Sequence, residues 1–270
     1  MIPLNPTLSP RAAAESHLPT GVPCVFFALS RESRPFLRLH RPPRRLHTTP
    51  FAATLVGRPA TSVLVVESGP GAKRAAIALD WLGKLPQLEV LSKAVSCIIS
   101  AGFAGALQQG FGVGDIILAT EIVDTKDNHW STSWSQSVPA AGEFHLRRGR
   151  LLTTPKVIGT SAEKRRLGQV HNAVAVDMES AIIAAWCADR AIPFGAVRTI
   201  SDPVEMELSS ELVALFGDGT PTAPRLTAAL ATKPTLVKEM WRLARTTRLA
   251  SRRLGSALRA LLGSQHSETA

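Results

Sequence analysis

Short apolar runs rich in β-branched residues alternate with longer stretches of helical periodicity along most of the chain. Several of these runs are apolar at every position, which is typical of strands that are covered on both faces. The pattern therefore predicts an α/β fold, a three-layer α/β/α domain around a central mixed, largely parallel sheet. We expect strands at 22–30, 62–69, 93–100, 114–124, 172–178 and 194–201, and helices at 71–85, 161–171 and 179–190.

Two local signals refine this pattern. Thr160 and Glu163 have the spacing of a capping box, which predicts that a helix begins beside them. The stretch 125–150, which contains Trp130 and Trp134, has no such periodicity and is interpreted as either a lid or an insertion.

The C-terminal part of the chain predicts a basic amphipathic helix over 236–262. Apolar residues share one face of that helix, and basic residues occupy the opposite one. Two interpretations stay open: a terminal helix packed on the domain with a solvated basic face, or an interfacial membrane helix. The two faces are Leu236, Met240, Leu243, Thr247, Leu254, Leu258 and Leu261, and Lys238, Arg242, Arg245, Arg248, Arg252, Arg253 and Arg259.

These elements divide the chain into three parts. Residues 1–21 are rich in Pro and Ser and have no continuous apolar core of a signal peptide, so we interpret them as a flexible lead-in. Residues 22–232 form the α/β domain, and 233–270 form the basic helical tail. No apolar run reaches the roughly 18 residues that a membrane span needs.

The amino-acid composition indicates the cellular compartment of the protein and the charge of its partner. Cys24, Cys97 and Cys187 each lie in an apolar run, which predicts reduced core thiols and a cytoplasmic protein. The net charge of +10 indicates an anionic partner such as nucleic acid, a membrane surface or a phosphorylated substrate. Basic residues gather in 31–45 and 236–262, at the ends of the chain, which argues against a central nucleic-acid groove.

Acidic residues mark the ends of three predicted strands. Asp177 and Glu179 stand where a buried strand meets a buried helix, Asp202 ends the next strand, and Glu32 follows the first. Because ligands bind at the carboxyl ends of the strands in such sheets, we expect these acids to gather at one edge.

Converging carboxylates have three common uses. They bind metal ions, but no histidine lies at ligand spacing near 177–179 or 202, so we expect no metal. They hydrolyse glycosidic bonds, where one acid protonates the leaving group and another activates water. They also accept hydrogen bonds from the two hydroxyls of a ribose. The last two uses are compatible in an enzyme that cleaves a ribosyl bond.

Over roughly 22–232 the chain resembles the superfamily of purine nucleoside phosphorylases and methylthioadenosine/S-adenosylhomocysteine nucleosidases. The motifs that carry the resemblance are VDMES, VRTISD, ALSRE, ESGPG, and SAGFAGAL followed by VGDIIL. The run GTSAEKRRLGQVHNAVAVDMES, the following ISDPVE and the arginine-rich tail are most similar to the hopanoid-associated branch. That branch removes adenine from adenosylhopane. The resemblance implies a nucleoside phosphorylase-like fold and a homo-oligomer.

The resemblance also implies roles for individual residues. Glu32 would activate the attacking water, and Asp202 would protonate the purine as it leaves. Glu179 would hold the ribose hydroxyls, with Met178 packed against the sugar. The implied substrate-binding residues are Glu179, Met178, Phe103, Gly102, Val157 and Ser201.

One motif departs from the superfamily. Its phosphorylases place a phosphate-binding arginine just before the turn of the third strand, where this chain has Ser100-Ala101-Gly102-Phe103. This departure favours water as the nucleophile and an apolar pocket. Ser68, Gly69 and Gly71 form a candidate anion or phosphate loop, so inorganic phosphate stays open as a co-substrate; no other cofactor is expected.

The sequence therefore predicts an enzyme that cleaves an adenine N-ribosyl bond, with an adenosyl lipid as the favoured substrate. A methylthioadenosine/S-adenosylhomocysteine nucleosidase is the alternative, and a non-catalytic nucleoside-binding protein is the second. The expected partners are an adenine nucleoside or adenosyl lipid and an anionic membrane surface bound through 236–262. No nucleic acid is expected, and we place the protein in the cytoplasm, peripheral on the inner face of the membrane.

Overall fold

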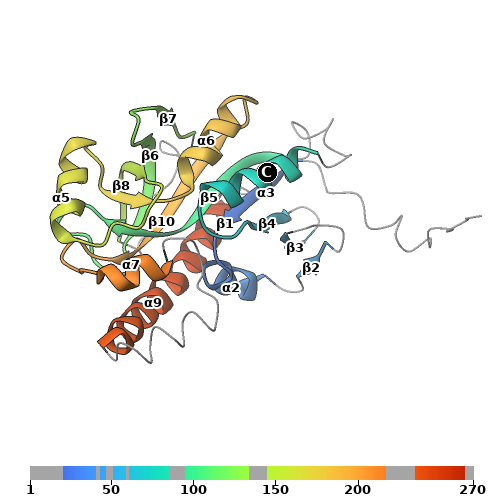
Figure 1. Cartoon of the computed structure of the whole chain (residues 1–270). Coiled ribbons are helices and arrows are strands. Elements are labelled where there is room, and N and C mark those ends of the chain that lie inside the picture. The colour runs from blue at the N-terminus through green and yellow to red at the C-terminus, as the bar shows by residue number, and fades with distance from the viewer. Residues whose placement is uncertain are drawn as a thin grey trace, which may run out of the picture.

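The computed structural model describes residues 21–40, 43–46, 51–58, 61–84, 95–133, 145–216 and 235–264. In these ranges a single mixed sheet lies at the centre of the molecule, with helices around it (Figure 1). The predicted lead-in, apart from Gly21, and Trp134 of the predicted lid lie outside the described residues.

The apolar runs form the strands that the sequence predicts. They are β1 (Val22–Phe27), β4 (Val63–Glu67), β5 (Val95–Ala106), β6 (Ile116–Asp124), β9 (Ala175–Asp177) and β10 (Phe194–Asp202). β1 pairs in parallel with β4 and β5, and β5 pairs in parallel with β10. β5 continues well beyond the predicted end, whereas β1 stops before Ser30, where an unpredicted helix begins.

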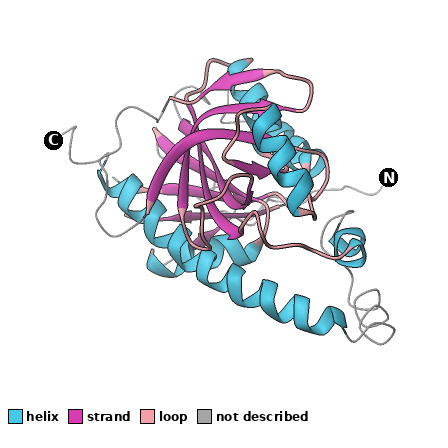
Figure 2. Cartoon of the chain, turned by 90° about the vertical axis from the view of Figure 1, so that its left-hand side faces the viewer, coloured by secondary structure: helices cyan, strands magenta, loops and turns pink. Residues whose placement is uncertain are grey.

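The sheet closes on itself at one end, which the sequence did not predict. β5 pairs with β10 on one side and with β9 on the other, and β6 and β8 (Leu146–Thr153) join β10 to β9. On the other side of β5 the sheet continues through β1 and β4 to β3 (Ala52–Val56) and β2 (Arg44–Arg45), and β7 (His129–Ser131) pairs with β6. The result is a strongly curved sheet (Figure 2). The sequence did not predict β8, because the arginines at its exposed positions interrupt the apolar run in LRRGRLLT.

Helices cover both faces of this sheet, as the three-layer prediction required. Cys24 and Phe26 of β1 pack in one core cluster with α3 (Ala72–Gly83) and α6 (Ser180–Ala188). The alternate residues Val25 and Phe27 pack in a second cluster with α2 (Ser30–Leu39) and α9 (Thr235–Ser264). The alternation follows from the period of two along a strand. The remaining helices are α5 (Ser161–Val170), where Thr160 accepts the predicted cap bond from the Glu163 N–H, and α7 (Ser210–Phe216).

The apolar face of the C-terminal helix is packed on the domain. Leu254, Leu258 and Leu261 of α9 are buried in the second core cluster. α9 also runs against α2 so closely that a Cβ on Gly255 would lie 2.9 Å from the backbone nitrogen of Phe36. Of the two interpretations of this helix, the packed terminal helix is therefore correct for its apolar face.

Two further predictions can be compared with the structure. Cys24, Cys97 and Cys187 are all free and buried, as predicted, and burial raises the pKa of the Cys187 thiol to about 12. Within the described ranges, every helix is too short or too polar to cross a bilayer.

Candidate active site

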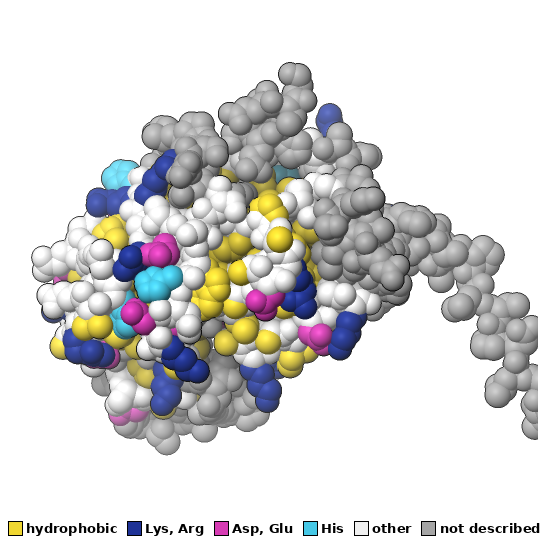
Figure 3. All heavy atoms as spheres, turned by 90° about the horizontal axis from the view of Figure 1, so that it is seen from above, with side chains coloured by type: hydrophobic (Ala, Val, Ile, Leu, Met, Phe, Trp, Pro, Cys, Tyr) yellow, Lys and Arg dark blue, Asp and Glu magenta, His cyan; other side chains and the backbone are white. Residues whose placement is uncertain are grey.

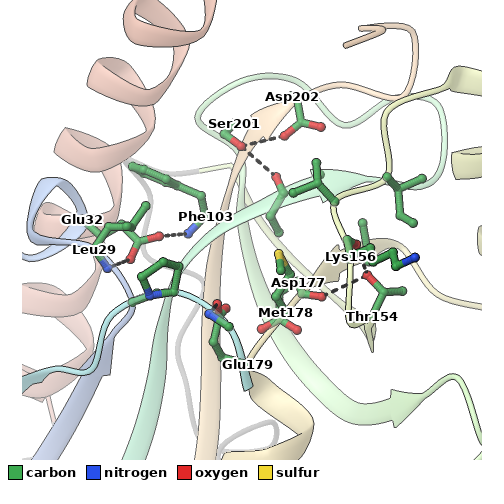
Figure 4. A pocket seen from close by; sticks show the side chains of 18 of the residues that line it. Leu29, Glu32, Phe103, Thr154, Lys156, Asp177, Met178, Glu179, Ser201 and Asp202 are labelled. Atoms are coloured by element: carbon green, nitrogen blue, oxygen red, sulfur yellow. Dashed lines mark hydrogen bonds between the residues drawn. The ribbon is translucent and has the colours of Figure 1, made fainter. Parts of the chain in front are cut away.

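A cavity of about 540 Å³ lies at the carboxyl ends of β1, β5 and β10 (Figure 4). The predicted site residues that line it are Glu32, Gly71, Phe103, Val157, Met178, Glu179, Ser201 and Asp202. Ser68, Gly69 and Gly102 are not among the lining residues. The acids predicted to gather at one edge of the sheet do so, although they come from segments far apart in the sequence.

Glu32 is held by backbone amides at the start of α2. One carboxylate oxygen accepts a hydrogen bond from the Phe103 N–H at 2.9 Å, and the other accepts one from the Leu29 N–H at 2.8 Å. Burial raises the pKa of this carboxyl, while the Phe103 N–H and the Arg198 guanidinium act in the opposite direction. A Cβ on Gly102 would lie 2.8 Å from Glu32 Oε1, so the glycine leaves room for the carboxylate. Gly102 therefore shapes the site without lining it.

Glu179 begins α6, and the amide of Gly71 holds its carboxylate. The Gly71 N–H, at the start of α3, donates to Glu179 Oε1 at 2.7 Å. Burial and the negative charge of Asp177 together raise the pKa of Glu179 to about 7, against the opposing effects of Arg198 and the Gly71 N–H. In the predicted anion loop, Ser68 Oγ donates to backbone carbonyls. The anion that this loop binds is thus the protein's own Glu179.

Asp202 is paired with a lysine that the sequence analysis missed. The fully buried Lys164 of α5 donates from Nζ to Asp202 Oδ2 at 2.7 Å and also to the carbonyls of Pro203 and Met206. Ser201 Oγ donates to Asp202 Oδ1 at 2.7 Å. The helical spacing of the sequence could have indicated that Lys164 is buried. It places Lys164 on the same face of α5 as Ser161, Leu167 and Gly168, which are buried.

Asp177 is a structural residue of the site and is neutralised by Arg198. Arg198 Nε donates to Asp177 Oδ2 at 2.9 Å, and Thr153 Oγ1 donates to Asp177 Oδ1 at 2.7 Å. Arg198 is itself buried and also donates to Ser100 Oγ at 2.6 Å and to Ser180 Oγ at 2.9 Å. The turn at 100–103 has no arginine of its own, yet the neighbouring strand β10 supplies one to Ser100. Removing one partner of such a buried pair is strongly destabilising, so Arg198 fixes the strand ends that carry the acids.

The labelled acids lie around one space. Figure 4 shows Glu32 and Glu179 on one side of the cavity, Asp202 on another, and Met178 beside Glu179. Much of the remaining lining is apolar, and α9 contributes Leu243 and Thr247 to it. Such an arrangement can activate a water molecule, hold a sugar and protonate a leaving group within one water-poor site.

Sequence comparison supports the interpretation of these motifs. The family model of the phosphorylase superfamily matches residues 28–136 and 124–233, which together include every acid of the site. A 5′-methylthioadenosine/S-adenosylhomocysteine nucleosidase of Exiguobacterium sp. (strain AT1b) is 27% identical over 168 residues, which cover 54% of this chain and 69% of that protein. A nucleosidase of the same name from Staphylococcus aureus (strain Newman) is 26% identical over 173 residues, which cover 55% of this chain and 73% of that protein.

Solved structures show a similar fold over most of the chain. A mutant of the Helicobacter pylori methylthioadenosine nucleosidase, with 5′-methylthioadenosine in its active site, aligns with a TM-score of 0.67 at 15% identity, over 91% of this chain and 99% of that one. Futalosine hydrolase of H. pylori aligns with a TM-score of 0.67 at 14% identity, over 90% and 98% of the two chains. At these identities the likeness concerns the fold alone, and it confirms the predicted α/β class.

Proposed function

The chain belongs to the phosphorylase superfamily, and on that premise we propose that it cleaves the N-ribosyl bond of an adenine nucleoside. The observation that carries the proposal is the convergence of Glu32, Glu179 and Asp202 on one cavity. Cleavage of this bond develops positive charge on the sugar and negative charge on the purine. Carboxylates beside the sugar and a proton donor beside the base stabilise those two charges.

Each acid has a distinct role in the proposed reaction. Glu32 takes a proton from the attacking water, since burial makes its carboxylate a stronger base than an exposed one. Glu179 accepts hydrogen bonds from the ribose hydroxyls while Met178 packs against the sugar. Asp202 gives a proton to the purine, and Lys164 at 2.7 Å stabilises the carboxylate that remains.

The structure favours water over phosphate as the nucleophile. Two groups near Glu32 that could bind phosphate already have partners: Gly71 donates to Glu179, and Arg198 donates to Asp177, Ser100 and Ser180. A phosphate ion in this position would have to displace these carboxylate and hydroxyl acceptors.

We expect the purified chain to release adenine from 5′-methylthioadenosine and S-adenosylhomocysteine in phosphate-free buffer. Liberated adenine is measured by chromatography with increasing phosphate. A rate that stays flat supports hydrolysis, and a rate that rises from near zero in proportion to phosphate contradicts it. Tight nucleoside binding without any adenine release would instead identify a non-catalytic nucleoside-binding protein.

An adenosyl lipid is the second candidate substrate. The cavity lining includes Leu208, Leu212 and Leu243, an apolar wall that suits a hydrocarbon 5′ substituent. The resemblance to the hopanoid-associated branch supports the same substrate. Comparing kcat/KM for adenosines with short and long 5′-alkylthio groups separates the two candidates, because a lipid-type site favours the long chain and a methylthioadenosine site disfavours it.

The acid limb of the pH profile should reflect Glu179. With a pKa raised to about 7, its carboxylate is ionised above that pH and protonated below it. The protonated form loses acceptor capacity for the ribose hydroxyls, so kcat/KM should fall roughly tenfold per pH unit below 7. In Glu179→Gln we expect this limb to disappear or to move to lower pH, leaving the titration of Glu32. An unchanged limb in that variant would assign it to another group.

A further inference from the structure

A second concave surface lies between α2 and α9, next to the candidate active site. This groove has a volume of about 730 Å³. Figure 1 shows the two helices side by side, and they pack closely at Gly255 and Phe36. The groove is lined by Arg31, Arg34, Pro35, Arg38, Leu39, Ala244, Thr247, Arg248, Ser251, Arg252 and Ser256.

Within the described ranges of the chain, the arginines of this groove have no acidic partners. Among the described residues, none of the five guanidinium groups forms an ion pair or a hydrogen bond, and no acid lines the groove. Elsewhere on the chain arginines are paired, as Arg150 is with Glu121 and Arg166 with Glu163. On the face seen in Figure 3, basic side chains also mix with acidic ones. Five unpaired positive charges on one concave surface repel one another, so this surface is suited to an anion.

The arginines stand in two rows. On α2 they recur at spacings of three and four residues from Arg31 to Arg38, which places them along one side over about 10 Å of helix. On α9, Arg248 and Arg252 are one turn apart. Two rows that extend over about two turns of α2 and one turn of α9 match several separate phosphate groups better than one small ion.

Exposed apolar side chains flank these rows. Trp241 is 67% exposed, Val237 51% and Leu39 40%. Trp241 precedes Arg248 by seven residues, so Trp241 lies on the same side of α9 as Arg248 and Arg252. Val237 lies one turn before Trp241. Arginine together with exposed tryptophan and aliphatic residues is typical of a surface that meets lipid headgroups and the upper acyl chains.

We propose that the α2–α9 groove and its exposed apolar flank dock on an anionic phospholipid bilayer. Charge complementarity carries the proposal, and the apolar flank favours a bilayer over a soluble phosphate compound. The buried leucines of α9 stay in the core, so the helix binds through its exposed side and does not insert its apolar face.

Docking would bring the candidate active site to the lipid surface. Arg31 and Thr247 line both the groove and the cavity, so the two spaces are adjacent. An apolar 5′ substituent held by Leu243 could then reach the active site from the bilayer. This last step rests on the proposed function, whereas the docking does not.

The test compares two triple charge reversals in the full chain. Arg34→Glu, Arg38→Glu and Arg248→Glu remove the groove charge, and Lys126→Glu, Arg165→Glu and Arg190→Glu change the net charge equally at exposed sites outside the groove. Deleting α9 would be unsuitable, because it would remove core leucines and part of the cavity lining.

We expect the intact chain to co-sediment with vesicles of phosphatidylcholine and phosphatidylglycerol and to ignore pure phosphatidylcholine. The groove variant should lose roughly 100-fold or more in partitioning, since each basic residue near the surface contributes on the order of fivefold. The control variant should keep most of its binding, because charges farther than about 8 Å are screened at physiological salt.

Three results would overturn the proposal. The first is that the intact chain does not bind anionic vesicles at low salt. The second is that both variants lose vesicle binding equally. The third is that inorganic phosphate or adenosine 5′-monophosphate competes fully with the vesicles, which would make the groove a soluble-phosphate site. Adenine release from a soluble nucleoside, measured without vesicles, should be the same in the groove variant as in the intact chain. A loss of that activity alone would count against the active-site assignment and not against docking.

Discussion

Replacing Asp202 with asparagine should slow adenine release by about 100- to 10,000-fold, the usual cost of losing a general acid. Asparagine keeps the shape of the side chain and an oxygen that can accept from Lys164 or Ser201, but it has no carboxyl proton to give to the purine. The measurement is kcat for adenine release, together with the Kd of a nucleoside, which should change little.

The buried Lys164 makes a control necessary for this variant. With an amide beside it, the ammonium group keeps the carbonyls of Pro203 and Met206 as acceptors but loses its counter-charge, which is destabilising in a buried site. Urea denaturation at the assay temperature shows whether the variant is folded. A ribose compound with p-nitrophenol as the leaving group should be cleaved at near the wild-type rate, because that group leaves without protonation. If p-nitrophenol release is as impaired as adenine release, Asp202 is not the proton donor.

Replacing Glu32 with glutamine should lower the rate by a similar factor of about 100 to 10,000, through the loss of the general base. The amide oxygen can still accept from the Phe103 N–H, whereas the amide nitrogen cannot accept from Leu29 or from water. Nucleoside binding should survive, because Glu179 and Met178 are unchanged.

The two variants should differ in how fast they cleave the ribose compound with p-nitrophenol as the leaving group. A p-nitrophenol leaving group does not supply a base for water, so Glu32→Gln should stay slow where Asp202→Asn recovers. Recovery of Glu32→Gln on that substrate would show that Glu32 does not act on the nucleophile. Near-wild-type adenine release in either variant would remove that residue from the proposed mechanism.

The local sequence determined the elements and the approximate place of the acids. Continuous apolar runs specified the central strands, because only a strand covered on both faces can bury every residue. The position of Asp202 at the end of one such strand and of Glu179 just after another was then enough to place them at one edge of a largely parallel sheet. That an acid lies next to the end of a strand is a property of the local sequence, and so it could be predicted.

The partners of those acids depended on contacts that join distant segments. Lys164 and Asp202 are 38 residues apart in the sequence, and Gly71 and Glu179 are 108 residues apart. A local sequence pattern cannot predict contacts between segments so far apart. Strand β8 was hidden by its arginines, and the closure of the sheet through β9 depends on long-range pairing.

The C-terminal helix shows the same division between local pattern and fold. Its periodicity predicted one apolar and one basic face, which is a property of the helix alone. Whether the apolar face met a bilayer or a protein core depended on the presence of a complementary surface, which β1, β5 and α2 form together. The sequence by itself thus determined the elements, the edge of the sheet where the acids gather and the amphipathic tail. Only the tertiary structure decided which charges are paired, because pairing depends on distances through space.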